Sequence, residues 1–203
     1  MALSEEQKKE RRQRYYQDCL EYINEYREND VFYHVTRREN VPSLLVNGFG
    51  PGRIGSEGGC QGGTGLSCAW CEGDAWDWGQ KLYGWGATLS VLKVSLPGVK
   101  LATHQRADES AQAATAWGLE QGYLLQERDE KGWPLPSLKL ESIFDSLSGL
   151  AKEMVSTGWT LTGLYLRSIG YDGYFIGIDE VVIVNFDILK ARAFSVARKE
   201  NNA

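Results

Sequence analysis

The sequence predicts a single α+β domain in which strands from both ends of the chain form one sheet and helices occupy the middle. Strand-like runs of β-branched and aromatic residues lie in the first half, at 31–35, 65–68 and 87–96, and again at 171–177, 179–186 and 191–197. Helical periodicity marks the segments between these two groups. We find neither an internal repeat nor a linker, so residues 1–203 are expected to form one domain.

The N-terminal segment, residues 1–29, is predicted to be a helix from residue 4 to about 28. Ser4 suits the N-cap position, and aromatic residues recur at helical spacing from Tyr15 onward. The lysines and arginines between 8 and 14 alternate with Glu and Gln. This pattern favours a solvated face, with a surface for an acidic partner as the alternative.

Two more helices and a glycine-rich loop are predicted in the first half. One helix, in ENVPSLLVNGF, ends at Gly48, and the other runs from Glu72 to about Tyr83. Between them, residues 50–65 hold eight glycines in sixteen positions, which is typical of a loop.

Residues 104–165 are predicted to be a helical insertion in this domain. The expected elements are a helix over 107–127, a polar, proline-containing loop over 129–137, and two helices over 138–170.

Composition and charge narrow the class of protein. The net charge of -5 argues against a protein whose main role is to bind the phosphate backbone of a nucleic acid. The first residues are charged throughout and no apolar run is long enough to span a bilayer. We therefore expect a soluble protein, in the cytoplasm of the producing cell or of a target cell after delivery.

The four cysteines are expected to be reduced thiols, because no signal peptide precedes them. Cys68 and Cys71 form a CxxC, and Cys60 lies eight residues before Cys68. A zinc site completed by His34 or His104 is an alternative use of these thiols. A strong zinc signature needs a second close pair, which the sequence lacks, so we expect no metal.

Three segments together resemble the ADP-ribosyltransferase fold: YHVT (33–36), GLSCAWCEGDAWDWG (65–79) and YDGYFIGIDEVVIVNFDIL (171–189). They are similar to its first strand, its second strand with the following helix, and its last strands. The closest likeness is to the diphtheria-toxin and poly(ADP-ribose) polymerase branch, whose signature is His, Tyr, Glu. The resemblance implies a split, mixed sheet that binds NAD, as substrate, in a cleft between its two halves.

The first segment is implied to bind NAD. His34 matches the histidine that bonds a ribose of NAD, and the backbone at Val35 and Thr36 matches the part that holds the nicotinamide amide. A neutral imidazole has one donor and one acceptor, which suits a pair of ribose hydroxyls. The alternative is a core histidine paired with a backbone carbonyl.

The second segment is implied to supply two aromatic rings that stack on the nicotinamide. Ser67 and Trp78 stand at the two ring positions, so Trp78 fits the pattern and Ser67 does not. A serine there is similar to the other branch of the family, with its Arg, Ser, Glu signature, so His34 and Ser67 indicate different subclasses. Ala75 matches the helical alanine of the motif. Alternative rings are Trp76, Tyr83 and Trp85.

The third segment is implied to supply the catalytic carboxylate. Cleavage of the nicotinamide–ribose bond develops oxocarbenium-like charge, which a carboxylate that accepts from the ribose 2'-hydroxyl stabilises. Family register selects Glu180, while Asp179 points to the opposite face of the strand. The apolar Ile178 argues against arginine as the acceptor. The alternative for Glu180 is an exposed carboxylate at a strand start.

The resemblance also places the glycine-rich loop near the diphosphate of NAD, where Arg53 is expected to make a contact. The loop matches neither GxxxxGK[ST] nor a Rossmann GxGxxG pattern. A surface loop without a ligand is the alternative.

These observations predict an NAD-dependent mono-ADP-ribosyltransferase, a glycosyltransferase that modifies a macromolecule of a host or competitor. The biological roles that fit are effector, toxin and phage counter-defence protein, and the acidic charge favours a protein acceptor over a nucleic acid. Two alternatives share the fold: a catalytically inactive binding module, and an NAD-dependent RNA 2'-phosphotransferase, which needs a cluster of basic phosphate ligands.

Overall fold

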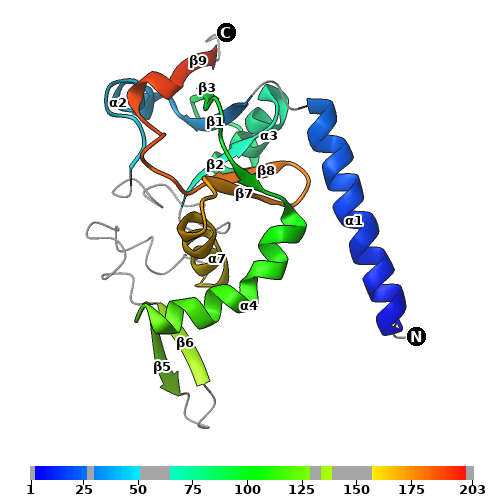
Figure 1. Cartoon of the computed structure of the whole chain (residues 1–203). Coiled ribbons are helices and arrows are strands. Elements are labelled where there is room, and N and C mark those ends of the chain that lie inside the picture. The colour runs from blue at the N-terminus through cyan, green and yellow to red at the C-terminus, as the bar shows by residue number, and fades with distance from the viewer. Residues whose placement is uncertain (1–2, 27–29, 51–64, 129–133, 139–156, 200–203) are drawn as a thin grey trace.

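Seven strands form one open, mixed sheet, which confirms the predicted α+β class (Figure 1). The computed structural model describes residues 3–26, 30–50, 65–128, 134–138 and 157–199. In these ranges the sheet has the order β4-β7-β8-β2-β1-β3-β9, and only β4 and β7 run parallel. The strands are β1 (Val31–Arg37), β2 (Leu66–Ala69), β3 (Leu89–Ser95), β4 (Leu101–Ala102), β7 (Gly173–Ile176), β8 (Glu180–Ile183) and β9 (Phe194–Lys199).

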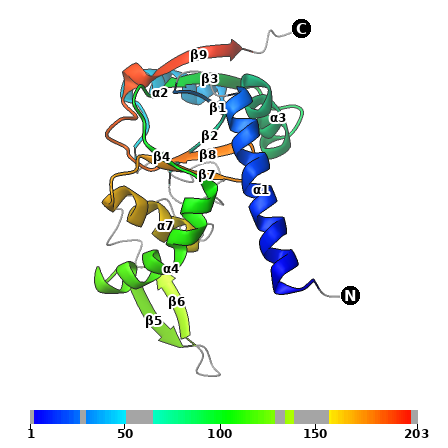
Figure 2. The same cartoon turned by 45° about the vertical axis from the view of Figure 1, so that its right-hand side comes forward.

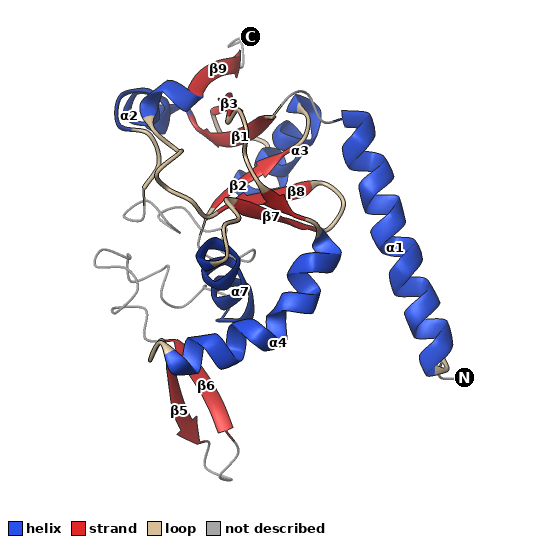
Figure 3. Cartoon of the chain, viewed as in Figure 1, coloured by secondary structure: helices blue, strands red, loops and turns tan. Residues whose placement is uncertain are grey.

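Five α-helices accompany this sheet in the described part of the chain (Figures 2 and 3). They are α1 (Glu5–Tyr26), α2 (Val41–Asn47), α3 (Glu72–Tyr83), α4 (His104–Glu120) and α7 (Thr157–Ser168). None of them combines the length and the apolar character that a membrane span requires.

The helix predicted over residues 4–28 is α1, and its start follows the predicted cap. The Gln7 backbone N–H donates to Ser4 Oγ at 3.2 Å, and the Ser4 N–H donates to Gln7 Oε1 at 2.9 Å. This reciprocal pair satisfies two donors that a helix start leaves without partners. The helix ended by Gly48 and the helix over 72–83 also form as predicted, as α2 and α3.

The middle of the chain is less helical than predicted. The helix α4 ends at Glu120, and β5 (Leu124–Arg128) pairs with β6 (Pro134–Leu138) in a separate antiparallel hairpin (Figure 1). The prediction of helix to 127 and of loop over 134–137 was therefore wrong. Gly122, with a φ of 71°, lies just after the end of α4, in a conformation that side chains disfavour. Of the two helices predicted over 138–170, α7 is described, and residues 139–156 lie outside the described ranges.

The helices divide one face of the sheet between them. Strand alternation puts Val35, Ala69 and Val182 on this face. The α3 side covers β1 and β3, where Ala75 packs against Val35 and Ala69. The α4 and α7 side covers β7 and β8, where Leu166 packs with Val182. The opposite face carries the largest apolar cluster, so the sheet is buried on both sides.

Candidate active site

Strands β1 and β2 are neighbours in the middle of the continuous sheet, and their pairing is short. Strand β1 pairs with β3 from Val31 to Arg37, but in the described residues it aligns with β2 at Tyr33↔Ala69 alone. The next antiparallel pair would join Val35 to Ser67. There, His34 Nδ1 donates to the Ser67 carbonyl oxygen at 2.8 Å. The imidazole thus satisfies the acceptor at the point where the ladder ends.

Glu180 reaches the same serine from the other neighbouring strand. Ala69 pairs with Glu180 and Ser67 with Val182, so Ser67 and Glu180 share a face of the sheet. The Ser67 side chain is near enough to the Glu180 carboxyl to influence its pKa. Burial raises the pKa of this carboxyl above its ordinary value, the Ser67 side chain lowers it, and the nearby Asp179 charge raises it.

His34 and Glu180 approach Ser67 from opposite faces of the sheet. The His34 side chain is on the face of Phe32, and its ring lies 6.5 Å from the Phe49 ring. Glu180 is half-buried on the face that α3, α4 and α7 cover. The structure therefore places His34 and Glu180 on either side of Ser67: His34 bonds to the Ser67 carbonyl, and Glu180 lies on the face of the Ser67 side chain.

The alternative to an NAD-binding role was a core histidine paired with a backbone carbonyl, and His34 makes such a bond. It also fixes the imidazole, because a carbonyl only accepts and Nδ1 must therefore carry a hydrogen. In the neutral ring, Nε2 is then an acceptor. A role of His34 in NAD binding stays a prediction.

Trp78 is connected to the turn that precedes Glu180. Its indole Nε1 donates to Asp179 Oδ2 at 3.0 Å, which joins α3 to the β7–β8 turn. The prediction that Asp179 points to the face opposite Glu180 was wrong: Asp179 lies in the turn before β8, and its carboxylate turns toward α3, which covers the face of Glu180. Ile178 is exposed in the same turn. Trp78 is thus bonded to the residue that immediately precedes Glu180.

The other predicted positions are structural or lie outside the described residues. Val35 is buried, and Thr36 Oγ1 accepts from Asn40 Nδ2 at 3.3 Å. Ala75 is buried on the side of α3 that packs against the sheet. Arg53 falls within residues 51–64, which are not described. Of the alternative rings, Trp76 and Tyr83 pack on the α3 cluster and Trp85 is 88% exposed.

Asp172 is a residue of the YDG motif whose role the sequence did not reveal. Its Oδ2 accepts from the Lys100 backbone N–H at 2.9 Å, and its Oδ1 accepts from Asn185 Nδ2 at 2.7 Å. The Asp172 carbonyl also accepts from the Val184 N–H at 2.8 Å. One aspartate therefore connects the segment before β4 with the end of β8. The sequence marked it only by its place in the YDG segment.

The described cysteines do not form a metal site. Cys68 is buried in the large apolar cluster, where burial raises its pKa. Cys71 caps α3, because its Sγ accepts from the Asp74 N–H at 3.4 Å. No group of three or more His, Cys, Asp or Glu side chains suited to a metal occurs among the described residues, and Cys60 lies outside them.

Comparisons of the chain with models of protein families, with curated proteins and with solved structures found no match.

Proposed function

We propose that the chain is a mono-ADP-ribosyltransferase that cleaves NAD and transfers ADP-ribose to a protein. The observation that supports it is the convergence of Glu180 and His34 on Ser67 at the junction of β1 and β2. The family resemblance placed all three in the site, although Ser67 stands where the family has an aromatic ring, and 146 positions separate His34 from Glu180 (180 - 34 = 146).

The donors and acceptors at this junction suit the ribose and amide groups of NAD. A carboxylate has lone pairs for several hydrogen bonds, so Glu180 can accept from a ribose hydroxyl with the Ser67 side chain beside it. Ser67 lies beside the carboxylate before substrate arrives, and His34 holds the Ser67 backbone. Such preorganisation is the main source of electrostatic stabilisation in enzymes.

In the proposed reaction Glu180 stabilises positive charge at the ribose. The bond between the ribose C1' and the nicotinamide nitrogen breaks, and its electron pair leaves with nicotinamide. A nucleophilic side chain of the acceptor forms the new bond to C1' and loses its proton to solvent. Glu180 is ionised throughout and accepts from the ribose 2'-hydroxyl, which places negative charge beside the oxocarbenium-like centre.

The proposal is tested by measuring nicotinamide release from NAD by the purified chain. We expect Glu180→Gln to lower the rate by about 10²-fold or more, because it removes the charge and keeps the shape. Glu120→Gln, at an exposed site at the end of α4, is the matched control and should retain the wild-type rate. NAD binding without release by the wild type would favour the inactive binding module instead.

A further inference from the structure

The first turns of α1 form a basic arm, defined here as residues 5–15, which the proposed function does not use. Five of the seven residues from 8 to 14 are Lys or Arg and one is Glu, in a chain whose net charge is -5. Every side chain from residue 3 to 15 is exposed. Figures 1 and 2 both show this end of α1 standing clear of the other elements.

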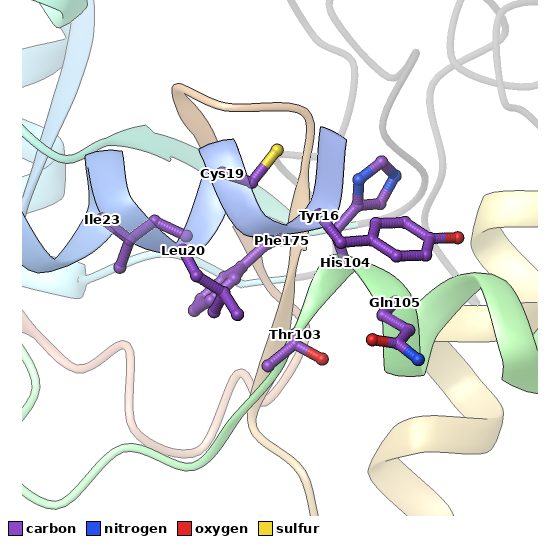
Figure 4. A pocket seen from close by; sticks show the side chains of 8 residues that line it. All are labelled: Tyr16, Cys19, Leu20, Ile23, Thr103, His104, Gln105 and Phe175. Atoms are coloured by element: carbon purple, nitrogen blue, oxygen red, sulfur yellow. The ribbon is translucent and has the colours of Figure 1, made fainter. Parts of the chain in front are cut away.

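The C-terminal half of α1 is packed against the domain and so fixes the orientation of the arm. Its buried side chains are Tyr16, Cys19 and Ile23. Figure 4 shows Cys19 and Ile23 on the part of α1 that lies over Phe175. The Tyr16 hydroxyl donates to Asp108 Oδ2 at 2.7 Å, which ties α1 to α4. An isolated helix of about eleven residues, the length of the arm, is marginally stable in water. The helical conformation of the arm therefore depends on the anchored half of α1.

The charges of the arm are unevenly distributed around the helix. At about 100° per residue, its five cations cover an arc of roughly 220°. The remaining arc carries Glu6, Glu10 and Gln13. Within the basic arc, Lys8 Nζ lies 2.6 Å from Glu5 Oε1, in an exposed ion pair that competes weakly with an external anion. The cations are Lys8, Lys9, Arg11, Arg12 and Arg14.

The width of this arc favours a groove over a flat surface as the partner. An acidic protein surface meets one side of a helix, whereas a groove with phosphates on both walls meets more than half of its circumference. The major groove of B-form DNA is about 12 Å wide and admits a helix, while the major groove of A-form RNA is too narrow. Eleven residues of helix span about 16 Å, enough to cross such a groove.

We propose that the basic arm docks in the major groove of duplex DNA and binds the phosphates of both strands. The proposal goes beyond the transferase function and does not rest on it. The long cationic side chains give affinity for phosphate without reading the base sequence. The binding is electrostatic and of the non-specific strength typical of such contacts, which is consistent with an acidic chain that carries one local basic element.

The test is fluorescence anisotropy of a labelled 20-base-pair duplex with the full chain and no NAD. One variant replaces all five arm cations with Gln. Its control makes the same change in net charge at exposed cations elsewhere: Lys81→Gln, Lys100→Gln, Arg106→Gln, Lys190→Gln and Arg192→Gln. We expect the arm variant to lose at least about 10-fold in affinity and the control to stay within about 3-fold, with wild-type binding that weakens steeply as salt rises.

Three results would overturn the proposal. They are no binding by the wild type at low salt, equal losses in the two variants, and tighter binding of poly-glutamate or of duplex RNA than of DNA. Circular dichroism of the arm variant checks that α1 still forms. Glu180→Gln should bind DNA like the wild type, so the DNA proposal and the transferase proposal fail or succeed separately.

Discussion

At the scale of single residues, Glu180 is the side chain to which the proposed reaction assigns the stabilisation of charge. It begins β8, shares a face of the sheet with the Ser67 side chain, and is half-buried on the face covered by helices. Burial makes the ionised form costly, and that cost has two measurable consequences, one for activity and one for stability.

The rate of nicotinamide release should fall on acidification with a midpoint above the ordinary glutamate pKa of about 4.3. The reason is that burial raises the pKa of Glu180, and only the ionised carboxylate stabilises the developing charge. A pH profile of kcat/KM between pH 4 and 8 measures this midpoint. A profile that stays flat down to pH 4 would contradict the assignment.

Replacement of Glu180 by Gln should stabilise the fold at neutral pH. Because burial raises the pKa of Glu180 in the folded state, this group contributes to the free energy of unfolding when it is protonated. That contribution is fully present below the unfolded-state pKa and is lost as pH rises through the folded-state pKa. Gln is neutral at every pH and avoids that loss, so we expect the variant to have a higher Tm than the wild type at pH 7.5. The difference in Tm should be about 2–4 °C for each kcal/mol gained in the free energy of unfolding. The difference from wild type should shrink toward pH 4. A lower Tm of the variant at pH 7.5 would be the opposite result.

Trp78 has two alternative roles: its ring stacks on the nicotinamide, or its indole N–H positions the turn before Glu180. Its Nε1 donates to Asp179 Oδ2, so Trp78→Phe keeps a ring and removes the donor. If positioning dominates, kcat should fall by about 10-fold, or about 1.4 kcal/mol, with little change in the KM for NAD. Trp76→Phe in the same helix is the control. An unchanged kcat with a raised KM would favour stacking.

At the scale of elements, α3 packs unusually close to the sheet. A Cβ added at Gly79 would overlap the Val35 side chain and lie 2.9 Å from Leu89 Cδ1, so only glycine permits this approach. Trp78 precedes Gly79 in α3, so the close packing at Gly79 also holds Trp78 near the sheet, where its indole N–H bonds to Asp179.

Gly79→Ala should therefore destabilise the fold by about 1–3 kcal/mol, as overpacking does. Gly73→Ala is a matched control in the same helix, since its added Cβ would meet Cys71 Sγ at an ordinary 3.8 Å. The control should be neutral or stabilising by up to about 1 kcal/mol, because alanine favours helix. Urea unfolding of both variants measures the difference, and equal stabilities would refute the close-packing argument.

The sequence predicted the elements whose signals are local. The segment from Glu72 to Tyr83 forms the predicted helix, and six strand-like runs became β1, β2, β3, β7, β8 and β9. The two-residue β4 and the hairpin of β5 and β6 were missed, because a very short strand has no periodicity and Pro134 and Pro136 read as loop residues. The Trp78–Asp179 bond joins residues 101 positions apart, and no local pattern encodes it.

At the scale of the whole molecule, the sheet joins the two ends of the chain around the junction of β1 and β2. The resemblance implied a sheet split into two halves, whereas the seven described strands form one open sheet. Within it the β1–β2 pairing is short, at Tyr33↔Ala69, and Ser67 lies beside it between His34 and Glu180. The middle of the chain contributes α4 and α7, which cover the half of the sheet that carries Glu180.

The proposed reaction transfers ADP-ribose to a protein, and labelling of proteins in a lysate shows whether it occurs. A cell lysate is incubated with the chain and with NAD labelled in its adenosine part, and the proteins are then separated and identified. We predict covalent label on one or a few proteins with the wild type and none with Glu180→Gln. Intact NAD and unlabelled proteins in the wild-type reaction, under conditions where the chain is folded, would show that the chain is not an ADP-ribosyltransferase.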